Sequence, residues 1–396
     1  MDDLDRDDQA LVRRAEGLAR GPFAARADRH DREASFPADD FDDLFAAGLL
    51  AAAVPVEHGG GGLGLRQGKL RALWQITRAL ARADLSLARC WEGHCNSMLL
   101  IDGLGSDEQR RRWFGGVREA GERWVAWSGE PQSRVPGEAG ATGTRLTRVS
   151  DGWVVEGSKV FATSAGAARR AILLINAEGP GGARHAAAAP ESLVLLVCDL
   201  HDASVQVDTD WWDPIGMRGT VSHRVRFERT FIPDADAIGA PGQYLRDGWQ
   251  TAFAPHYAAS FLGAAEAANE WALACIAAQG KAGDPYVQAR CGQMAVDLET
   301  ADLWLAHVAG LWARGQVAAA QQAGVRARYA VEMLAAATVD HVVRACGARS
   351  LLRPSPVERI VRDLTLYMRH DNADHILATI GKAALGVASD ASFYRP

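Results

Sequence analysis

The sequence predicts an α+β protein in which a helical N-terminal domain, a central β domain and a C-terminal helical bundle follow one another. In the first and last parts of the chain, apolar residues recur every three or four positions, as in amphipathic helices. Between about residues 123 and 235 they alternate with polar residues, as in strands. No glycine-rich dinucleotide loop and no Walker A sequence is found, which excludes the common nucleotide-binding α/β folds. The expected domains are 1–122, 123–235 and 236–396.

Composition narrows the class of protein further. The chain has 396 residues, a formal net charge of −6 and 48% hydrophobic residues, and its pI near 6.0 argues against nucleic-acid binding. No apolar run approaches the roughly 20 residues of a membrane span. The acidic start at residues 1–5 lacks the features of a signal peptide, so we expect a cytoplasmic protein without membrane contact. Six scattered cysteines without CxxC spacing predict reduced thiols and no metal site.

Helices are expected in the N-terminal domain over residues 7–19, 36–49, 66–83 and 85–104. Leu11, Ala15 and Leu18 illustrate the spacing of the first helix. Pro37 suits the first turn of the second helix, because its fixed φ is compatible with a helix start. The four glycines at 59–62 separate the second and third helices, since glycine adopts backbone conformations that end a helix.

Strands are expected in the middle domain at 152–157 and 192–199 and around Val205–Val207 and Val225–Phe227, each bounded by Gly, Pro or Asp. After about residue 240 the pattern is helical again. The clearest stripe consists of Val287, Cys291, Met294, Leu298, Ala301, Leu305, Val308 and Trp312. This spacing is typical of a helix buried in a bundle.

Six segments, in order along the chain, resemble motifs of the acyl-CoA dehydrogenase superfamily. They are residues 54–60, 127–131, 151–159, 163–166, 216–227 and 356–363. The resemblance implies an N-terminal helical domain, a central β-barrel or sandwich, and a C-terminal four-helix bundle. It also implies a homotetramer or homodimer that binds a small-molecule substrate, in the family acyl-CoA, and a flavin, normally FAD.

The same resemblance implies which residues hold the flavin. In the family, two segments of the β domain contact its reactive edge, and here they correspond to Trp127, Ser128 and Gly129 and to Phe161, Thr163 and Ser164. The family's adenosine-binding loop falls on residues 344–350, where only Gly347 of its glycines remains. Its acyl-CoA segment is missing at 132–137, and its neighbour-subunit segment is missing at 279–284. These departures leave FMN as the alternative to FAD.

The family's reaction requires a carboxylate that removes an α-proton while a hydride passes to flavin N5. The usual glutamate lies eight residues after the aspartate of an Arg-Asp motif. Counting from Asp363 reaches Asp371, a carboxylate one methylene shorter. The resemblance therefore assigns Asp371 as the base of a dehydrogenase acting on a CH–CH bond.

A second branch of the superfamily offers an alternative function. The ending His370-Asp371-Asn372 also resembles two-component flavin monooxygenases, which take reduced flavin from a partner reductase and form a flavin hydroperoxide with O₂. His370 would then bond the peroxide. Trp91 and His94 would line the substrate cavity, with a core or interface position as the alternative for His94. A third alternative is a family member without catalytic activity.

Overall fold

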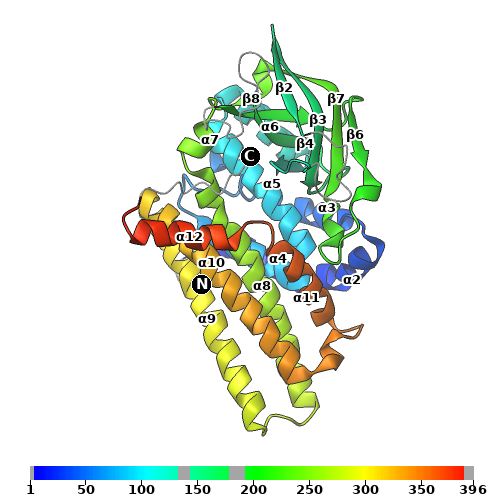
Figure 1. The fold of residues 1–396 in the computed structure, drawn as a ribbon, viewed down its shortest axis with the longest axis vertical. Helices are drawn as coiled ribbons and strands as arrows, with labels where there is room; N and C mark the ends of the chain where they lie inside the picture. Colours follow the sequence, from blue (N-terminus) through cyan, green and yellow to red (C-terminus); the bar gives the residue numbers. More distant parts are fainter. Residues whose placement is uncertain (1–3, 133–142, 178–191, 388–396) are drawn as a thin grey trace.

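The computed structural model describes residues 4–132, 143–177 and 192–387, and it arranges them in the expected order of helices, strands and helices (Figure 1). The change from helix to strand lies between Ala120 and Trp124, and the return to helix lies between Ile238 and Gln243. Among the described residues, no helix combines the length and apolar character required to cross a bilayer.

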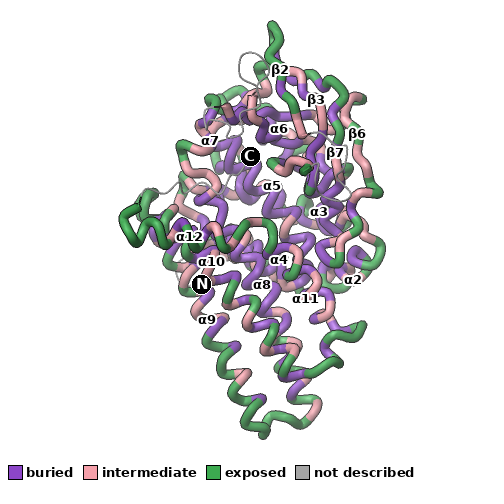
Figure 2. The backbone as a smooth tube through the Cα atoms, in the orientation of Figure 1, coloured by how far each residue is buried: buried purple, intermediate pink, exposed green. Residues whose placement is uncertain are grey.

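Six α-helices lie in the described part of the N-terminal domain. They are α1 (Arg6–Leu18), α2 (Ala24–Glu33), α3 (Ala38–Ala46), α4 (Leu70–Ala83), α5 (Leu85–Leu104) and α6 (Asp107–Ala120). Ser106 and Gln109 form a reciprocal capping box at the start of α6. Pro37 is the N-cap of α3, one position before the first turn. Helix α5 is buried almost all round, so it passes through the centre of the molecule (Figure 2).

The β domain consists of two four-stranded sheets. One has the order β1–β4–β5–β8, from β1 (Trp124–Trp127), β4 (Arg170–Asn176), β5 (Leu193–Asp199) and β8 (Ala237–Ile238). The other has the order β2–β3–β7–β6, from β2 (Arg145–Val149), β3 (Gly152–Ala162), β7 (His223–Pro233) and β6 (Val205–Asp208). Among the described strands, only the β1–β4 pair is parallel. The described strands form a sandwich and not a closed barrel, and β8 continues the first sheet beyond residue 235.

The first sheet is covered on both faces. Leu173 and Ile175 of β4 point into the core between the sheets, and Ile172 and Leu174 point into the helical core. Successive side chains of a strand face opposite ways, so a strand buried on both sides has no polar alternation. This explains why β4, an apolar run, was not among the strands expected from period-two patterning.

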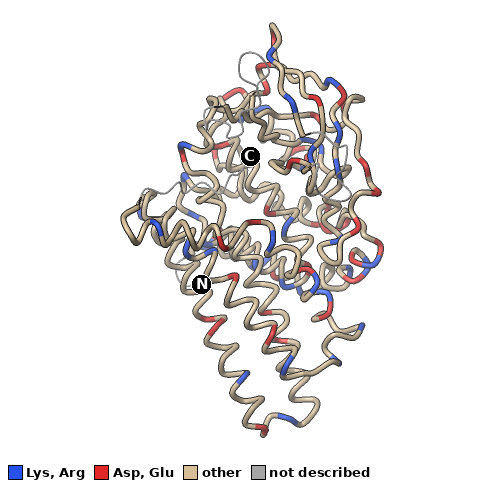
Figure 3. The backbone as a smooth tube through the Cα atoms, in the orientation of Figure 1, with Lys and Arg blue, Asp and Glu red and all other residues tan. Residues whose placement is uncertain are grey.

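The C-terminal region is built on three long helices, α8 (Trp249–Ala278), α9 (Pro285–Ala313) and α10 (Val317–Cys346). The shorter α11 (Pro356–Tyr367) packs on α8, and α12 (Ala373–Ala384) packs on α10, so the C-terminal region is helical as expected. A four-residue helix, α7 (Gln243–Arg246), leads into α8. Basic and acidic residues are interspersed along the chain in Figure 3.

Candidate active site

A cavity of about 850 Å³ lies between the β domain and the helices. Its β wall comes from the ends of strands and the loop before β7, and its helical wall comes from α5, α7, α8 and the C-terminal end of α11. Its lining includes Arg89, Ser128, Gly129, Glu130, Phe161, Thr163, Trp212, Met217, Thr220, Ser222, Tyr244, Gln250, Tyr257, Tyr367, Arg369, His370 and Asp371. Six residues proposed from the sequence therefore meet here: Ser128, Gly129, Phe161, Thr163, His370 and Asp371.

Gly129 brings the end of β1 close to β3. Its carbonyl accepts a hydrogen bond from the Val160 N–H at 3.2 Å. A Cβ at Gly129 would lie 2.3 Å from the Val160 carbonyl oxygen, so no larger residue fits without moving the backbone. Next to it, Phe161 has a φ of 52° and stands exposed against Trp211 and Trp212, with ring centroids 5.1 and 5.9 Å away. The local backbone therefore presents an aromatic ring at the cavity edge.

Hydroxyl groups line the β wall. Ser222 Oγ donates to Thr163 Oγ1 at 3.2 Å and lies 2.8 Å from Thr220 Oγ1, which in turn donates to the Met217 carbonyl. Because Thr163 Oγ1 accepts from Ser222, its own hydroxyl hydrogen remains available to a molecule in the cavity. The carbonyl of Thr163 accepts from Trp127 Nε1 at 3.0 Å, so Trp127 supports the wall from behind. Ser164 lies behind it too, bonded through its N–H to the Thr220 carbonyl at 2.8 Å.

A buried lysine fixes the loop that carries Ser128. Lys159 Nζ donates to the carbonyls of Ser128 at 3.3 Å and Leu174 at 2.7 Å and pairs with Glu130. Burial lowers the pKa of Lys159, and Glu130 opposes that change. The carboxylate of Glu130 also accepts from the backbone N–H and the hydroxyl of Thr144. Glu130 is thus occupied by structural partners although it faces the cavity.

His370 lies on the helical wall between a cation and an anion. Its Nδ1 is 3.1 Å from Asp371 Oδ1, and its Nε2 is 3.4 Å from a terminal nitrogen of Arg89. Arginine can only donate and a carboxylate can only accept, so these neighbours assign the Nδ1–H tautomer of the neutral ring. The ring packs against Tyr257 and Tyr367, at centroid distances of 5.2 and 6.0 Å. The Nε2 lone pair is therefore directed toward Arg89.

Asp371 has two basic neighbours. Besides His370, Arg328 Nε of α10 lies 3.5 Å from its second oxygen, and Arg328 also pairs with Glu332 one turn further on. Burial would raise the pKa of Asp371, but His370, Arg328 and Arg89 together hold it below the ordinary value of 3.8. The side chain is consequently an anion at neutral pH, with one oxygen directed at the Nδ1–H group of His370 and the other at the guanidinium of Arg328.

A buried polar network lies behind Arg89. Glu92, one turn along α5, accepts from Arg89 at 3.1 Å, from Asn96 at 3.0 Å and from the Tyr367 hydroxyl. Asn96 Oδ1 lies 2.8 Å from His256 Nδ1. Burial lowers the pKa of His256 to about 3, so its ring is neutral. The network connects the cavity wall to the centre of the helical core.

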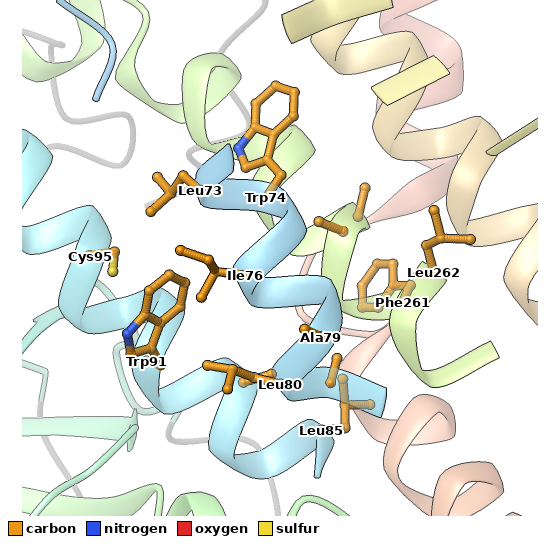
Figure 4. Close-up of a cluster of buried hydrophobic side chains, with 14 of the residues drawn as sticks. Leu73, Trp74, Ile76, Ala79, Leu80, Leu85, Trp91, Cys95, Phe261 and Leu262 are labelled. Carbon is orange, nitrogen blue, oxygen red and sulfur yellow. The ribbon is translucent and has the colours of Figure 1, made fainter. Parts of the chain in front are cut away.

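Trp91, His94 and Gly347 do not line this cavity. Trp91 is fully buried beside the side chains of α4 (Figure 4). His94 is also fully buried: its Nδ1 accepts from the Trp124 N–H at 3.1 Å, so its Nε2–H donates to the Leu50 carbonyl at 2.8 Å. Burial lowers the pKa of His94 to about 4. Gly347 follows α10 at a φ of 70°, and a Cβ added there would meet nothing within 4 Å. His94 therefore lies in the core, its alternative position, and Trp91 lies in the core instead of at the cavity where it was expected.

The Arg-Asp motif supports the cavity without lining it. Asp363 Oδ1 accepts from the Met217 N–H at 2.5 Å, and Arg362 binds both oxygens of Asp31 at 2.8 and 2.6 Å. A Cβ on Gly216 would lie 2.3 Å from the Arg362 carbonyl group. The two motifs, about 150 positions apart in sequence, thus hold the β7 loop against α11 and α2.

Sequence reasoning missed several lining residues, including Arg89, Tyr244, Gln250, Tyr257 and Tyr367. For Ser222 a signal was present, because it lies inside the motif at 216–227. The helical residues carry no comparable signal, since a polar residue on a helix reads as solvent-exposed until its neighbours are known. The missing acyl-CoA segment lies mostly outside the described residues. Among the described residues, no three His, Cys, Asp or Glu side chains are grouped to hold a metal ion.

Fold and cavity together define a helix–sandwich–helix protein with a site between its sheets and its bundle. Family models for the acyl-CoA dehydrogenase N-terminal domain and C-terminal domain match residues 5–119 and 256–375. The chain belongs to the acyl-CoA dehydrogenase family.

Similar proteins in the family include dehydrogenases and oxygenases. A dibenzothiophene monooxygenase of Rhodococcus erythropolis is 28% identical, over 97% of this chain and 94% of its own length. The putative acyl-CoA dehydrogenase YdbM of Bacillus subtilis is 25% identical, over 86% of this chain and 88% of its own. The FMN-bound structure of TdsC, a dibenzothiophene monooxygenase from Paenibacillus sp. A11-2, superposes with a TM-score of 0.85 at 23% identity, covering 97% of this chain and 100% of that one.

Proposed function

We propose that this chain is a flavin-dependent monooxygenase that receives reduced flavin from a separate reductase. The observation that carries the proposal is the state of Asp371. A base that removes a carbon-bound proton needs a pKa raised toward the working pH. Asp371 has the opposite environment, because His370 and Arg328 keep its pKa low and His370 is hydrogen-bonded to one of its oxygens. It is suited to orienting His370, a role in which a fixed carboxylate selects the tautomer of an imidazole.

The β wall has the groups that a flavin ring requires. Thr163 has a hydroxyl hydrogen to donate, and Gly129 has no side chain where the backbone approaches Val160. The exposed ring of Phe161 offers an aromatic surface at the same edge. These residues would hold the flavin, which when bound supplies the two electrons that reduce one atom of O₂ to water while the other atom enters the substrate. The poorly matching loop at 344–350 favours FMN over FAD.

His370 and its neighbours account for the proton chemistry. In the neutral ring, Nε2 can take up a proton and later return it, while Nδ1–H remains bonded to Asp371. The carboxylate of Asp371 stabilises the charged imidazolium that results. A terminal nitrogen of Arg89 lies 3.4 Å from Nε2, the nitrogen that would take up the proton.

Similarity to the Rhodococcus enzyme supports the oxygenase proposal, because that alignment spans nearly the whole of both chains. The second candidate is a dehydrogenase in which Asp371 acts as the base. It is supported by the presence of this carboxylate in the cavity and by its position eight residues after Asp363 in the sequence. The family assembly of a homotetramer or homodimer is proposed for this chain as well.

One experiment separates the two functions. The flavin extracted from the purified protein is identified, and the reconstituted holoprotein is mixed without oxygen with a series of acyl-CoAs. We expect no bleaching of the flavin spectrum. With NADH, a flavin reductase and O₂, an indole or thiophene probe is expected to gain oxygen, measured with ¹⁸O₂ by mass spectrometry. Bleaching by an acyl-CoA, or the absence of label from every probe, would contradict the proposal.

A further inference from the structure

Arg89 presents an incompletely bonded cation to the cavity. Its two terminal nitrogens contact Glu92 at 3.1 Å and His370 at 3.4 Å, and its guanidinium lies 5.6 Å from the centre of the Tyr367 ring. A guanidinium has five N–H donors, and these contacts use two of them. The described residues supply no further hydrogen-bond partner. Several N–H groups of Arg89 are thus left for a molecule in the cavity.

Glu92 holds Arg89 in place but cannot cover it from the cavity side. Its first oxygen already accepts from Asn96 as well as from Arg89, and its second oxygen accepts from Tyr367. Glu92 is fully buried, so it cannot turn toward the cavity. Burial disfavours the charge of Arg89, yet Tyr367 and Glu92 keep its pKa above the ordinary value, and it remains a cation.

The other carboxylates that face the cavity have partners of their own. Glu130 is bonded to Lys159 and Thr144, and Asp371 lies between His370 and Arg328. Asp371 faces Arg89 only across His370. Among the described carboxylates, Glu92 bonds Arg89 directly, whereas Asp371 acts on Arg89 electrostatically from the other side of His370.

Aromatic rings lie on the same helical wall as this cation. Tyr367 lies beside Arg89, Tyr257 packs on His370, and Tyr244 also lines the cavity. Flat rings offer apolar contact to a planar molecule and prefer offset or edge contacts. A fixed guanidinium next to them is suited to a carboxylate or similar planar anion, because its fork of donors matches two oxygens.

We infer that the helical wall is a subsite for the anionic group of an aromatic substrate, and that Arg89 is the residue that recognises it. The inference rests on the proposed function in placing the flavin against the β wall and the substrate against the helical wall. Arg89 is thereby a specificity-determining residue, and Glu92 is its positioning residue.

The test compares benzoate with benzamide, two probes of nearly equal shape that differ in charge. Their dissociation constants are measured by isothermal titration calorimetry on the full chain loaded with FMN. A charge-assisted bond at a partly buried site is expected to make benzoate bind at least about tenfold more tightly than benzamide. Arg89→Gln should abolish that preference, and Arg89→Lys should retain part of it because the charge remains without the fork. Melting curves verify that each variant is folded.

Arg369→Gln is the matched control, because Arg369 is an exposed cation that also lines the cavity. Its benzoate preference should change less than about twofold if Arg89 is the recognition residue. The inference would be overturned if the wild-type protein bound the two probes equally or bound neither. It would also be overturned if the benzoate preference survived in Arg89→Gln or was lost in Arg369→Gln. Binding requires neither O₂ nor reductase, so an inactive protein that still prefers benzoate would contradict the proposed function alone.

Discussion

Asp371→Asn tests the central assignment, because the two candidate functions give this carboxylate different roles. The substitution keeps the shape and removes the charge that lies 3.1 Å from His370 Nδ1 and 3.5 Å from Arg328 Nε. Arg328 retains Glu332, so the loss is that of one charge-assisted contact, and the free energy of unfolding should fall by about 2 kcal/mol. Asp374→Asn, three residues further on at an exposed position, should change it by less than about 0.5 kcal/mol.

Urea unfolding measures the effect, and pH gives a second check. The folded pKa of Asp371 is below its ordinary value of 3.8, so its stabilisation is complete above that pH and is lost as the pH falls through the folded value. The difference in the free energy of unfolding between wild type and Asp371→Asn should therefore be the same at pH 5 and at pH 7. The oxygenase reading further predicts retained flavin and a rate of oxygen transfer lower by about 10²-fold. Unchanged stability together with an unchanged rate would refute the reasoning.

Three other substitutions test the surroundings of the cavity. Gly129→Ala should lower both the flavin content and the melting temperature, because the added Cβ would lie 2.3 Å from the Val160 carbonyl oxygen. Gly115→Ala is the control and should lower neither, because the added Cβ would meet nothing within 4 Å. His94→Ala should reduce the free energy of unfolding by about 3 kcal/mol by leaving two backbone groups unpaired, and a stable variant with altered probe binding would contradict its core role. Burial raises the pKa of Asp363 to about 7, so the folded state keeps a proton that the unfolded chain releases, and wild-type stability should fall between pH 5 and pH 8. Asp363→Asn should remove that slope in urea unfolding, and an identical slope in the variant would argue against this origin.

Several features of the fold followed from local patterns. The expected helix at 85–104 matches α5, and the stripe from Val287 to Trp312 lies within α9. Such patterns are readable because an element buried on one side repeats its apolar residues with its own period. β4 was missed for the converse reason, since it is buried on both faces. The sequence left a β-barrel and a β-sandwich as alternatives for the middle domain. The pairing of the strands into two sheets decides between them, and local sequence patterns carry no information on which strands pair.

The sequence by itself determined the family, the order of helices and strands, and the segments that form the β wall, because these reside in contiguous motifs. Only the tertiary structure decided which side chains of α5 face the cavity. Arg89 reaches it, whereas Trp91 and His94, two and five positions later, turn into the core. A helix rotates by about 100° per residue, so neighbours in sequence point in different directions. The tertiary structure decides which of these directions leads into the cavity. The folded chain places His370 next to Arg89, although the two residues are 281 positions apart in sequence.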